Sequence, residues 1–587
     1  MSRRDRAGQI RRSQYIYTYG PGSIVNVKVG PVTMSLCMGD LRTWEFKSSA
    51  LTRKYQQVVD ERIIRELKSK FKGFDSISHF RLPPVDPSKN DDTSALWASI
   101  FPSWLLCPQC RSLYDITDDE QSRDCHRMER GVRRYCNKCS NQQKKVWVVP
   151  TRFVIACKNG HLDSFDYKWW LNNYGKNVDK DCPHDELRLL QNEGSLAITN
   201  LTLKCKQCEG KASLSDIFKV EYKCSGKKPW EYTEEFPPKR EDCKERCRVQ
   251  QRNSRSIWQR INLSALAIPP LDYEFPKMIG PETFDEIKDA NEEDRKVYVR
   301  LKFKKIADLW KTRQGEDMPY TQDTLLEKIN QEIAKYEELS SDIYQDEYEV
   351  LMTEKIEKIN EFKKIMHNIP KSYPKINAIA EVQKLKVVDA VIGFTRVNGD
   401  PIFYQKNSFL PAVEVFGEGF FINFDQKFIN NFIKNKYIQE EFNFFKNNLE
   451  PAEKRKILLH SIAHCILKAT ARFAGYSITS IKERLYVSEK MSGILIYTSS
   501  SDSEGTLGGL SRLAEPDRIS EILKEAEKIS LTCSSDPLCG EGLYTEGNEN
   551  NGSVCHSCLI VPETSCDFQN EFLSRGVTKT FWDNIKK

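Results

Sequence analysis

No stretch of this 587-residue chain is apolar over the roughly 18 residues that a membrane-spanning helix needs. The first residues, Met1-Ser-Arg-Arg-Asp-Arg, lack the apolar segment of a signal peptide. Hydrophobic residues make up 39% and charged residues 29% of the chain, as in ordinary globular proteins. We therefore expect a cytoplasmic protein with no membrane span, and about three or four domains at roughly 150 residues each.

The chain also lacks a Walker motif. Its Gly-Lys pairs begin at Gly175, Gly210 and Gly226, and none is followed by Ser or Thr or preceded by the phosphate-loop glycine. We therefore expect this chain to be no enzyme, because ATP hydrolysis would need that motif. The loop Ser499–Leu510, with Gly505–Gly509 inside it, could present backbone N–H groups to a phosphate, but glycines serve plain turns equally well.

A metalloprotease motif is missing as well. His460 and His464 stand one helical turn apart, which is ligand spacing, but Ser461 occupies the position of the general-base glutamate. Two histidines packed at the edge of a core are the favoured interpretation. The alternative is a zinc-dependent hydrolase or nuclease that uses His460, His464 and a third ligand, whose activity would disappear when both histidines are changed to alanine.

What the chain has is clustered cysteine. Of its 19 cysteines, twelve fall between Cys107 and Cys247 and five between Cys533 and Cys566. Cytoplasmic thiols stay reduced, so clustered cysteines there bind metal more often than they form disulfides. The sequence therefore predicts zinc as the cofactor, in two or three structural sites.

The sharpest motif is a pair of Cys-x-x-Cys knuckles. Cys107 and Cys110 form the first, and Cys136 and Cys139 form the second after 25 intervening residues. Each knuckle closes a tight loop, and four thiolates complete a tetrahedral zinc shell. Because such a shell leaves no position open for substrate, the pattern indicates a structural site.

The C-terminal cysteines predict another four-thiolate site. We assign Cys533, Cys539, Cys555 and Cys558 as its ligands, with Cys566 as the alternative for one of them.

A further knuckle, Cys205 and Cys208, predicts another zinc in the N-terminal half. Cys224 and either Cys243 or Cys247 are its expected partners.

A half-site is also expected where Cys157 and His161 follow a predicted strand. Cys182 and His184 could complete it, although a histidine packed in a glycine turn is an equally simple explanation. Cys125 fits no pair.

The hydrophobic pattern favours an α+β multidomain protein. We expect a zinc-ribbon-like N-terminal half, a helical middle segment and an α/β C-terminal domain with a Cys-rich zinc site. The expected segments are 1–100 (strand-turn-strand and helical), 101–270 (Cys-rich), 271–380 (helical insertion) and 381–587 (α/β). The expected helices cover Thr52–Phe71, Ile356–Ile365 and Ala452–Phe473. The expected strands cover Val146–Ile155, Val387–Val397, Glu414–Phe424 (with a bend at Gly417–Gly419) and Ile494–Thr498. Two further strands are expected within Tyr15–Val27, one on each side of Gly20–Gly22.

A net charge of +6 permits a nucleic-acid surface without requiring one. Residues 1–12 carry five arginines and one aspartate, which suits either a solvated tail or an arm that contacts phosphates. The candidate DNA-contacting residues are Arg3, Arg4, Arg11, Arg12, Lys144, Lys145, Lys204 and Lys206.

Several segments carry a family resemblance. They are Arg12-Ser-Gln with Gly20-Pro-Gly, Arg152-Phe-Val-Ile-Ala-Cys-Lys-Asn-Gly-His-Leu-Asp, Ile392-Gly-Phe-Thr-Arg-Val, Glu414-Val-Phe-Gly-Glu-Gly, Leu459-His-Ser-Ile-Ala-His, Ile496-Tyr-Thr-Ser-Ser-Ser-Asp-Ser-Glu-Gly-Thr-Leu-Gly-Gly-Leu and the terminal Cys-rich stretch. In these segments the chain resembles the DrmB family, subunits of the DISARM anti-phage defence system of bacteria. Its C-terminal half is also similar to the domain that ends MrfA-type DNA helicases, which has a four-cysteine metal site.

The resemblance implies a non-catalytic partner of a DrmA-like helicase that hydrolyses ATP. Together the two chains are expected to bind foreign DNA, with a DNA methyltransferase and other defence components as indirect partners. The remaining alternative is a zinc-finger scaffold that binds no nucleic acid.

Overall fold

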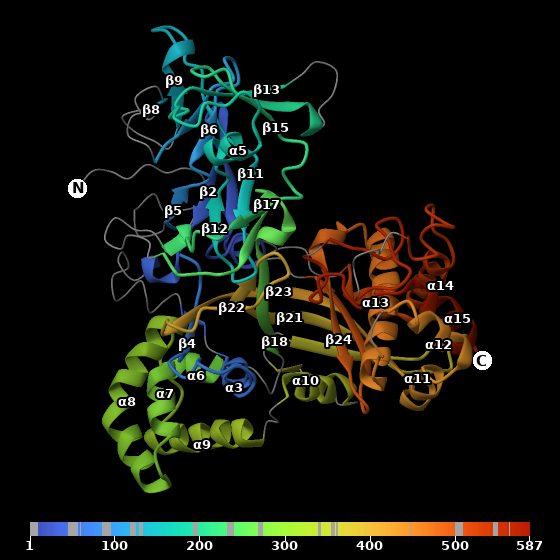
Figure 1. Ribbon diagram of the computed structural model, residues 1–587. Helices are drawn as coiled ribbons and strands as arrows, with labels where there is room; N and C mark the ends of the chain where they lie inside the picture. The colour runs from blue at the N-terminus through green and yellow to red at the C-terminus, as the bar shows by residue number, and fades with distance from the viewer. Residues whose placement is uncertain are drawn as a thin grey trace. The chain divides into compact units, whose positions relative to one another are not determined.

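The computed structural model describes residues 10–44, 57–58, 60–84, 96–117, 125–127, 133–191, 198–231, 240–267, 274–338, 342–353, 358–359, 362–445, 448–498, 509–543, 550–562 and 564–587. The chain divides into two compact units (Figure 1). Unit 1 comprises Met1–Val58, Lys72–Leu263 and Ala390–Val413, and unit 2 comprises Val59–Phe71, Ser264–Asp389 and Glu414–Lys587. Among the described residues, no helix is long and apolar enough to cross a membrane.

The described part of unit 1 contains five small antiparallel sheets, with strand orders β1-β2-β5, β10-β6-β7, β12-β11-β17-β16, β13-β14-β15 and β8-β9. Their strands are β1 (Ile24–Val29), β2 (Val32–Met38), β5 (Ala98–Ile100), β6 (Trp104–Leu106), β7 (Leu113–Asp115), β8 (Cys125–Arg127), β9 (Arg134–Cys136), β10 (Val149–Pro150), β11 (Phe153–Ala156), β12 (Leu162–Ser164), β13 (Leu187–Gln191), β14 (Leu201–Cys205), β15 (Lys211–Ser213), β16 (Glu221–Lys223) and β17 (Arg246–Gln251). The unit also holds helices α1 (Arg12–Tyr17) and α5 (Tyr167–Tyr174) and the short strands β3 (Gln57–Val58), β4 (His79–Arg81) and β22 (Ile402–Phe403).

The core around β11 is small and aromatic. Phe165 lies at its centre, with its ring edge-on to Phe153, Tyr167 and Tyr222 and tilted against Trp170. Strands of three to five residues bury little apolar surface each, so such a unit benefits from additional cross-links.

The strand expected before the Gly20–Gly22 turn is wrong, because residues 12–17 form α1. The Gln14 side chain accepts a hydrogen bond from the Arg11 N–H at 2.9 Å, which caps the first turn of the helix. The strand expected after the turn forms as β1.

Unit 2 is organised on a sheet with the order β19-β20-β21-β23-β25-β24, joined by β18 at β21. Its strands are β19 (Lys358–Ile359), β20 (Phe362–His367), β24 (Ile481–Val487) and β25 (Ser492–Thr498). Three longer strands lie partly in unit 2 and partly in unit 1, namely β18 (Gln259–Ala267), β21 (Ile376–Thr395) and β23 (Phe409–Phe424). Its helices are α3 (Glu61–Lys70), α6 (Glu274–Ile279), α7 (Pro281–Lys288), α8 (Glu292–Gln314), α9 (Gln322–Glu338), α10 (Ile343–Met352), α11 (Gln426–Phe432), α12 (Lys436–Phe442), α13 (Pro451–Ala474), α14 (Pro516–Leu531) and α15 (Arg575–Ile585).

Helix α13 is the central helix of unit 2. Pro451 takes its first position after a capping box formed by Glu450 and Glu453, and Gly475 ends it in the left-handed conformation at φ 68°. Its middle is buried on every side because it packs on β24, β25, α14 and α15 (Figure 1, orange and red). A polar side chain in that stretch therefore needs a specific partner.

Helices α6 to α9 form a separate helical subdomain whose buried core includes Phe284, Ile306 and Ile329. The expected helix over Ile356–Ile365 is wrong, because strands β19 and β20 occupy its described part. β20 pairs with β21, and the Lys364 ammonium donates to the carbonyls of Val350 and Thr353. Sheet pairing has overridden a helical periodicity here.

The unit 2 sheet corrects the α/β class expected for the C-terminal domain, whereas the α+β class expected for the whole chain is confirmed. The pairs β20–β21, β23–β25 and β24–β25 are antiparallel, so the protein is a mixed α+β multidomain chain. The bend expected at Gly417–Gly419 is absent, since β23 is continuous. A Cβ at Gly419 would lie 2.1 Å from the Ile496 carbonyl oxygen, so glycine there permits close approach of β25.

Within the helix expected over Thr52–Phe71, residues 57–58 form strand β3 instead, and residues 61–70 form α3. It begins where the Asp60 carboxylate accepts the N–H groups of Arg62 and Ile63. Residues 51–56 lie outside the described part of the chain.

Candidate metal centres

Among the described residues, five clusters of cysteine, histidine and glutamate place their ligand atoms within 4.8 Å of one another, and we name them sites A to E. The clusters are site A (Cys107, Cys110, Cys136, Cys139), site B (Cys157, His161, Cys224, Cys243), site C (Cys182, His184, Cys205, Cys208), site D (Cys533, Cys539, Cys555, Cys558) and site E (His460, His464, Glu483, Cys566). Sites A, B and C lie in unit 1, and sites D and E lie in unit 2.

Site A joins two knuckles that end strands, as a zinc ribbon does. The Sγ atoms of Cys107 and Cys139 are 3.9 Å apart, and those of Cys110 and Cys136 are 3.8 Å apart. Zinc–sulfur bonds of about 2.3 Å in a tetrahedron place sulfurs about 3.8 Å from one another. The four thiolates therefore fit one zinc ion.

Hydroxyl groups surround the sulfurs of site A. Ser112 Oγ lies 3.2 Å from Cys110 Sγ, and Tyr114 Oη lies 3.0 Å from Cys136 Sγ. Burial alone would raise the pKa of Cys110, but hydrogen bonding to Ser112 lowers that pKa to about 6. Such groups favour the thiolate form that binds metal.

Sites B and C combine the remaining N-terminal ligands differently from the sequence-based grouping. The structure does not bring Cys205 and Cys208 together with Cys224 and Cys243. The pair Cys182 and His184 joins the Cys205–Cys208 knuckle, and the pair Cys157 and His161 joins Cys224 and Cys243 instead. The residues expected to form one site and one half-site therefore form two clusters of four ligands each.

Site B forms where β11 and β17 pair. Cys157 Sγ lies 3.4 Å from His161 Nδ1 and 3.7 Å from Cys224 Sγ. The other ring nitrogen of His161 lies 3.0 Å from the Glu241 carboxylate, which orients Nδ1 toward the cysteines. Hydrogen bonding to Cys247 lowers the pKa of Cys157, so Cys247 is a neighbour of this site.

Site C repeats this arrangement. Cys182 and Cys205 sulfurs are 3.8 Å apart, and Cys208 Sγ lies 3.7 Å from His184 Nδ1. His184 Nε2 lies 2.8 Å from the Asn172 side-chain oxygen, which can only accept, so Nε2 carries the proton and Nδ1 is free to bind metal.

A buried arginine holds the loop of site B. The Arg396 guanidinium donates to the carbonyl oxygens of Gly22, Gly160 and Ile257, and Gly160 lies between the ligands Cys157 and His161. Arg396 also lies over the rings of Trp230 and Phe394. Burial lowers the pKa of Arg396 to about 10, which leaves it charged at neutral pH. The three carbonyls therefore receive charge-assisted hydrogen bonds.

Site D fits zinc as closely as site A does. The Sγ distances are 3.4 Å for Cys533 and Cys555, 3.7 Å for Cys539 and Cys558, and 3.8 Å for Cys555 and Cys558. Four thiolates around zinc carry two net negative charges. Lys468, which donates to the Cys558 carbonyl, supplies a neighbouring positive charge.

Cys566, expected as the alternative ligand of site D, lies instead in site E with His460 and His464. Glu483 completes that site and is the ligand that sequence reasoning missed. No spacing motif marks it, because it comes from strand β24 and the histidines come from helix α13. Cys125, which fitted no pair, belongs to none of the clusters among the described residues.

The candidate DNA-contacting residues differ in their exposure and in the contacts that they already make. Arg11, Lys144, Lys145 and Lys206 are exposed, whereas the Lys204 ammonium already pairs with Glu209. The half-buried Arg12 donates to the Pro83 carbonyl at 3.2 Å. Arg3 and Arg4 lie outside the described residues, as does most of the candidate phosphate loop, residues 499–508.

The grouping of ligands into sites B and C predicts how many zinc ions each set of substitutions removes. Changing Cys205 and Cys208 to serine should remove one zinc per chain, and adding Cys224→Ser should remove a second, because the two sites share no ligand. Elemental analysis of the purified variants measures both losses, with Cys125→Ser as the control that keeps all zinc. Loss of only one zinc in the triple variant would restore the single-site grouping.

Comparison with known proteins agrees with this geometry. Residues 462–559 match the MrfA Zn-binding domain, and the match contains all four cysteines of site D. Residues 11–259 match a domain of unknown function (DUF8724), which contains sites A, B and C. The chain is thus a protein with a zinc-binding domain of the MrfA type near its C-terminus.

The chain is also similar along its length to a curated protein. It is 26% identical over 592 residues to the DISARM protein DrmB of Bacillus paralicheniformis (strain ATCC 9945a / NCIMB 11709 / CD-2), and the alignment covers 93% of this chain and 96% of that protein. The chain is a homologue of DrmB, and the resemblance noted in its sequence is confirmed.

Proposed function

We propose that this chain is a non-catalytic, zinc-stabilised subunit of a DISARM-type anti-phage defence complex, which partners a DNA helicase and helps to bind foreign DNA. The observation that carries the proposal is the match to DrmB over 93% of the chain, together with a complete four-thiolate site D inside the matched zinc-binding domain. Sites A to D each have four protein ligands and no open position, which is the form of structural zinc. We propose zinc in all four.

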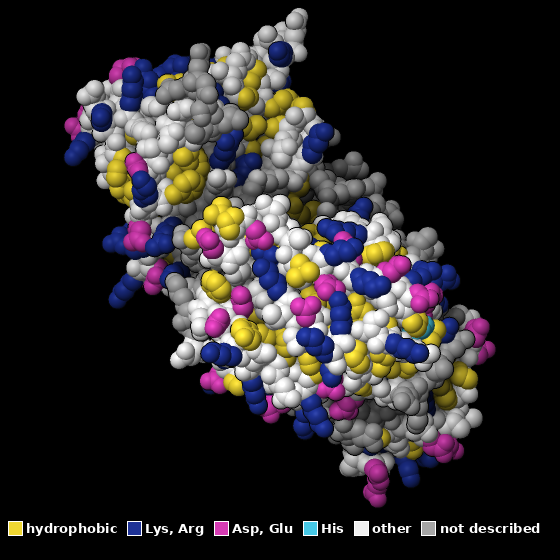
Figure 2. Space-filling model, turned by 90° about the vertical axis from the view of Figure 1, so that its right-hand side faces the viewer, with side chains coloured by type: hydrophobic (Ala, Val, Ile, Leu, Met, Phe, Trp, Pro, Cys, Tyr) yellow, Lys and Arg dark blue, Asp and Glu magenta, His cyan; other side chains and the backbone are white. Residues whose placement is uncertain are grey.

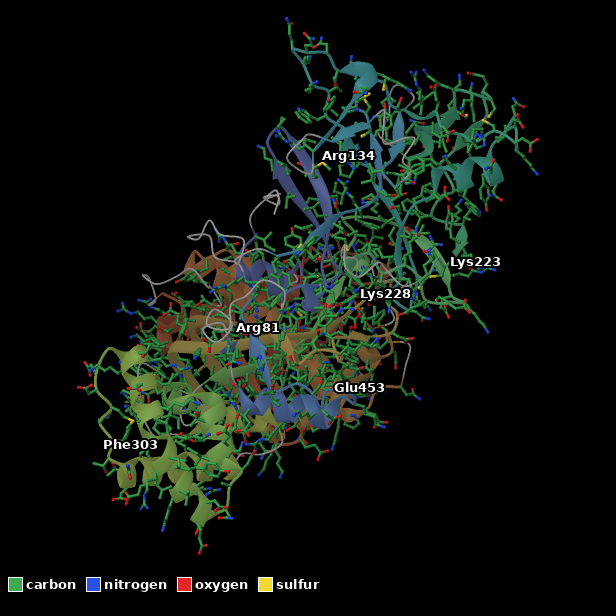
Figure 3. All side chains as sticks on the ribbon, turned by 90° about the vertical axis from the view of Figure 1, so that its left-hand side faces the viewer. Arg81, Arg134, Lys223, Lys228, Phe303 and Glu453 are labelled. Atoms are coloured by element: carbon green, nitrogen blue, oxygen red, sulfur yellow. The ribbon has the colours of Figure 1, made fainter. Side chains whose placement is uncertain are left out.

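An exposed cation pair on unit 1 supports DNA contact. Lys223 of β16 and Arg246 of β17 face each other directly across the ladder, and both side chains are exposed (Lys223 is labelled in Figure 3). Like charges in such a pair repel, and a bound phosphate would relieve the repulsion. The site B ligand Cys224 directly follows β16, and the ligand Cys243 lies three residues before β17, so a zinc ion there would hold the pair in place.

Unit 2 offers no comparable concentration of positive charge on the face shown in Figure 2. There, lysine and arginine side chains alternate with aspartate and glutamate over most of the visible surface (Figure 2). We assign the phosphate contacts to unit 1 because of the exposed Lys223 and Arg246 pair.

The alternative of a zinc hydrolase at His460 and His464 has less support. Both histidines are fully buried, and Glu483 and Cys566 complete four donors with them, so site E has neither an open ligand position nor an exposed face.

A salt titration tests the DNA contact. Changing Lys223 and Arg246 to alanine should lower the slope of log affinity against log salt by about 2, since each phosphate contact contributes roughly 0.9. The matched control changes Lys296 and Arg300, two exposed cations of α8, and should leave the slope unchanged. The measurement uses the chain alone and with its co-expressed helicase. An unchanged slope for the Lys223 and Arg246 variant contradicts this assignment, and failure of the helicase to co-purify contradicts the partnership.

A further inference from the structure

Site E is buried in the core of unit 2. His460 and His464 project from helix α13, Glu483 from strand β24 and Cys566 from the segment that follows site D. The relative exposures of the four residues are 0, 0, 1 and 2%. Four polar groups from three separate parts of the chain thus meet where water does not reach.

The four ligand atoms converge on one point. Glu483 Oε1 lies 2.9 Å from His460 Nε2 and 3.2 Å from His464 Nε2, and Cys566 Sγ lies 3.2 Å from His460 Nε2. The edges of a tetrahedral zinc site with nitrogen, oxygen and sulfur ligands are roughly 3.3 to 3.7 Å long. These three distances are slightly shorter than such edges, and all four ligand atoms lie within 4.8 Å of one another.

The tautomer of His464 leaves a lone pair pointing into the cluster. Its Nδ1 lies 2.8 Å from the carbonyl oxygen of Leu559, and a carbonyl can only accept, so Nδ1 carries the proton. In the neutral ring Nε2 is then a bare acceptor facing the Glu483 carboxylate oxygen, also an acceptor. Two such atoms 3.2 Å apart need either a proton or a metal ion between them. This is the arrangement of His161 and His184 in sites B and C, where one ring nitrogen is held and the other faces the metal ligands.

Charge favours a divalent ion over an empty site. A divalent cation bound by two neutral imidazoles, one carboxylate and one thiolate has no net charge, which avoids the cost of a buried ion. Glu483 Oε2 has no hydrogen-bond partner among the described residues, and a bidentate carboxylate would use it.

We propose that His460, His464, Glu483 and Cys566 bind an additional zinc ion. Imidazole and thiolate together select zinc over magnesium or calcium, and four protein ligands in a buried site exclude substrate. The ion would fasten helix α13 to strand β24 and to the C-terminal segment. The matched zinc-binding domain spans 462–559, so it omits His460 and Cys566, and site D alone accounts for its metal.

Elemental analysis of the full-length chain tests this proposal. The double variant His464→Gln and Cys566→Ser should contain one zinc per chain less than the parent. The control is Cys465→Ala, which removes a fully buried thiol of the same helix that belongs to no described cluster and should retain every zinc. Equal zinc in the folded double variant and the parent would overturn the proposal. A metal other than zinc lost in the variant would overturn the choice of ion.

If the double variant does not fold, zinc X-ray absorption of the parent decides. Sites A to D alone average about 3.5 sulfur ligands per zinc, whereas five occupied sites average about 3 with one nitrogen or oxygen, counted from the donor sets. The higher sulfur number would overturn site E. Neither measurement depends on DNA or helicase binding, so the outcome is separate from that of the proposed function.

Discussion

Removing zinc from site D should unfold the C-terminal part of unit 2. Between the end of α14 and the start of α15 the described residues form no helix or strand of ordinary length, yet Cys539 and Cys558 are 0 and 1% exposed. Local turns there are held by backbone hydrogen bonds such as Cys539 N–H to Ser535 and Cys558 N–H to Cys555, and the metal ligands add a constraint that joins the two pairs of cysteines. Structural zinc contributes about 10 to 16 kcal/mol in small metal domains at neutral pH.

The experiment changes Cys533 and Cys555 to serine and follows amide hydrogen exchange. We expect protection to fall by at least about 100-fold in residues 550–587, whose α15 packs on α13 and α14. Cys465→Ala serves as the control, since it alters the same core without removing a ligand. Unchanged protection in a variant shown to have lost its zinc would contradict a structural role for site D.

Changing Glu347 to alanine should cost about 3 to 5 kcal/mol of unfolding free energy, because it leaves the Arg484 guanidinium charged and unpaired. Both side chains are 0% exposed. Arg484 binds Glu347 through two N–H groups, with N–O distances of 2.6 and 2.9 Å. The same carboxylate accepts from the Tyr486 hydroxyl at 3.0 Å and from the Leu266 N–H at 2.7 Å. Helix α10 is thus tied to strands β18 and β24.

Urea denaturation of the full-length chain measures this loss of unfolding free energy. Glu349→Ala, on the same helix but exposed, should change stability by less than about 0.5 kcal/mol. Replacing the pair together, Glu347→Leu with Arg484→Met, should cost less than Glu347→Ala alone, because no charge is left buried. Equal costs for Glu347→Ala and Glu349→Ala would show that the ion pair is not structural.

Local spacing made some of the metal sites predictable from the sequence. The knuckles Cys107–Cys110 and Cys136–Cys139 are short loops whose ends must lie together whatever the rest of the fold does. Helix α13 was predictable for the same reason, because its cap and its periodicity lie within one segment.

Partners that are distant in the sequence were not predictable. Cys157 and Cys224 meet because β11 and β16 both pair with β17, and nothing in the spacing of the cysteines encodes that pairing. Glu483 reaches His460 from a strand beyond the helix, and a single glutamate carries no motif. Sheet pairing decides these sites.

The resemblance segments acquire a physical meaning in unit 1. Three of them, around Gly20–Gly22, Arg152–Asp163 and Ile392–Val397, meet at Arg396, whose guanidinium binds the carbonyls of Gly22 and Gly160. A single buried cation thus connects segments that are hundreds of residues apart.

The most direct test of the account is the amount of zinc in the purified full-length chain, measured by elemental analysis under reducing conditions. We predict five zinc ions per chain, four in the cysteine-rich sites A to D and one in site E. A content of four zinc ions per chain would contradict only the proposed zinc ion in site E. Three or fewer would contradict the central claim that each of the cysteine-rich clusters holds its own zinc ion.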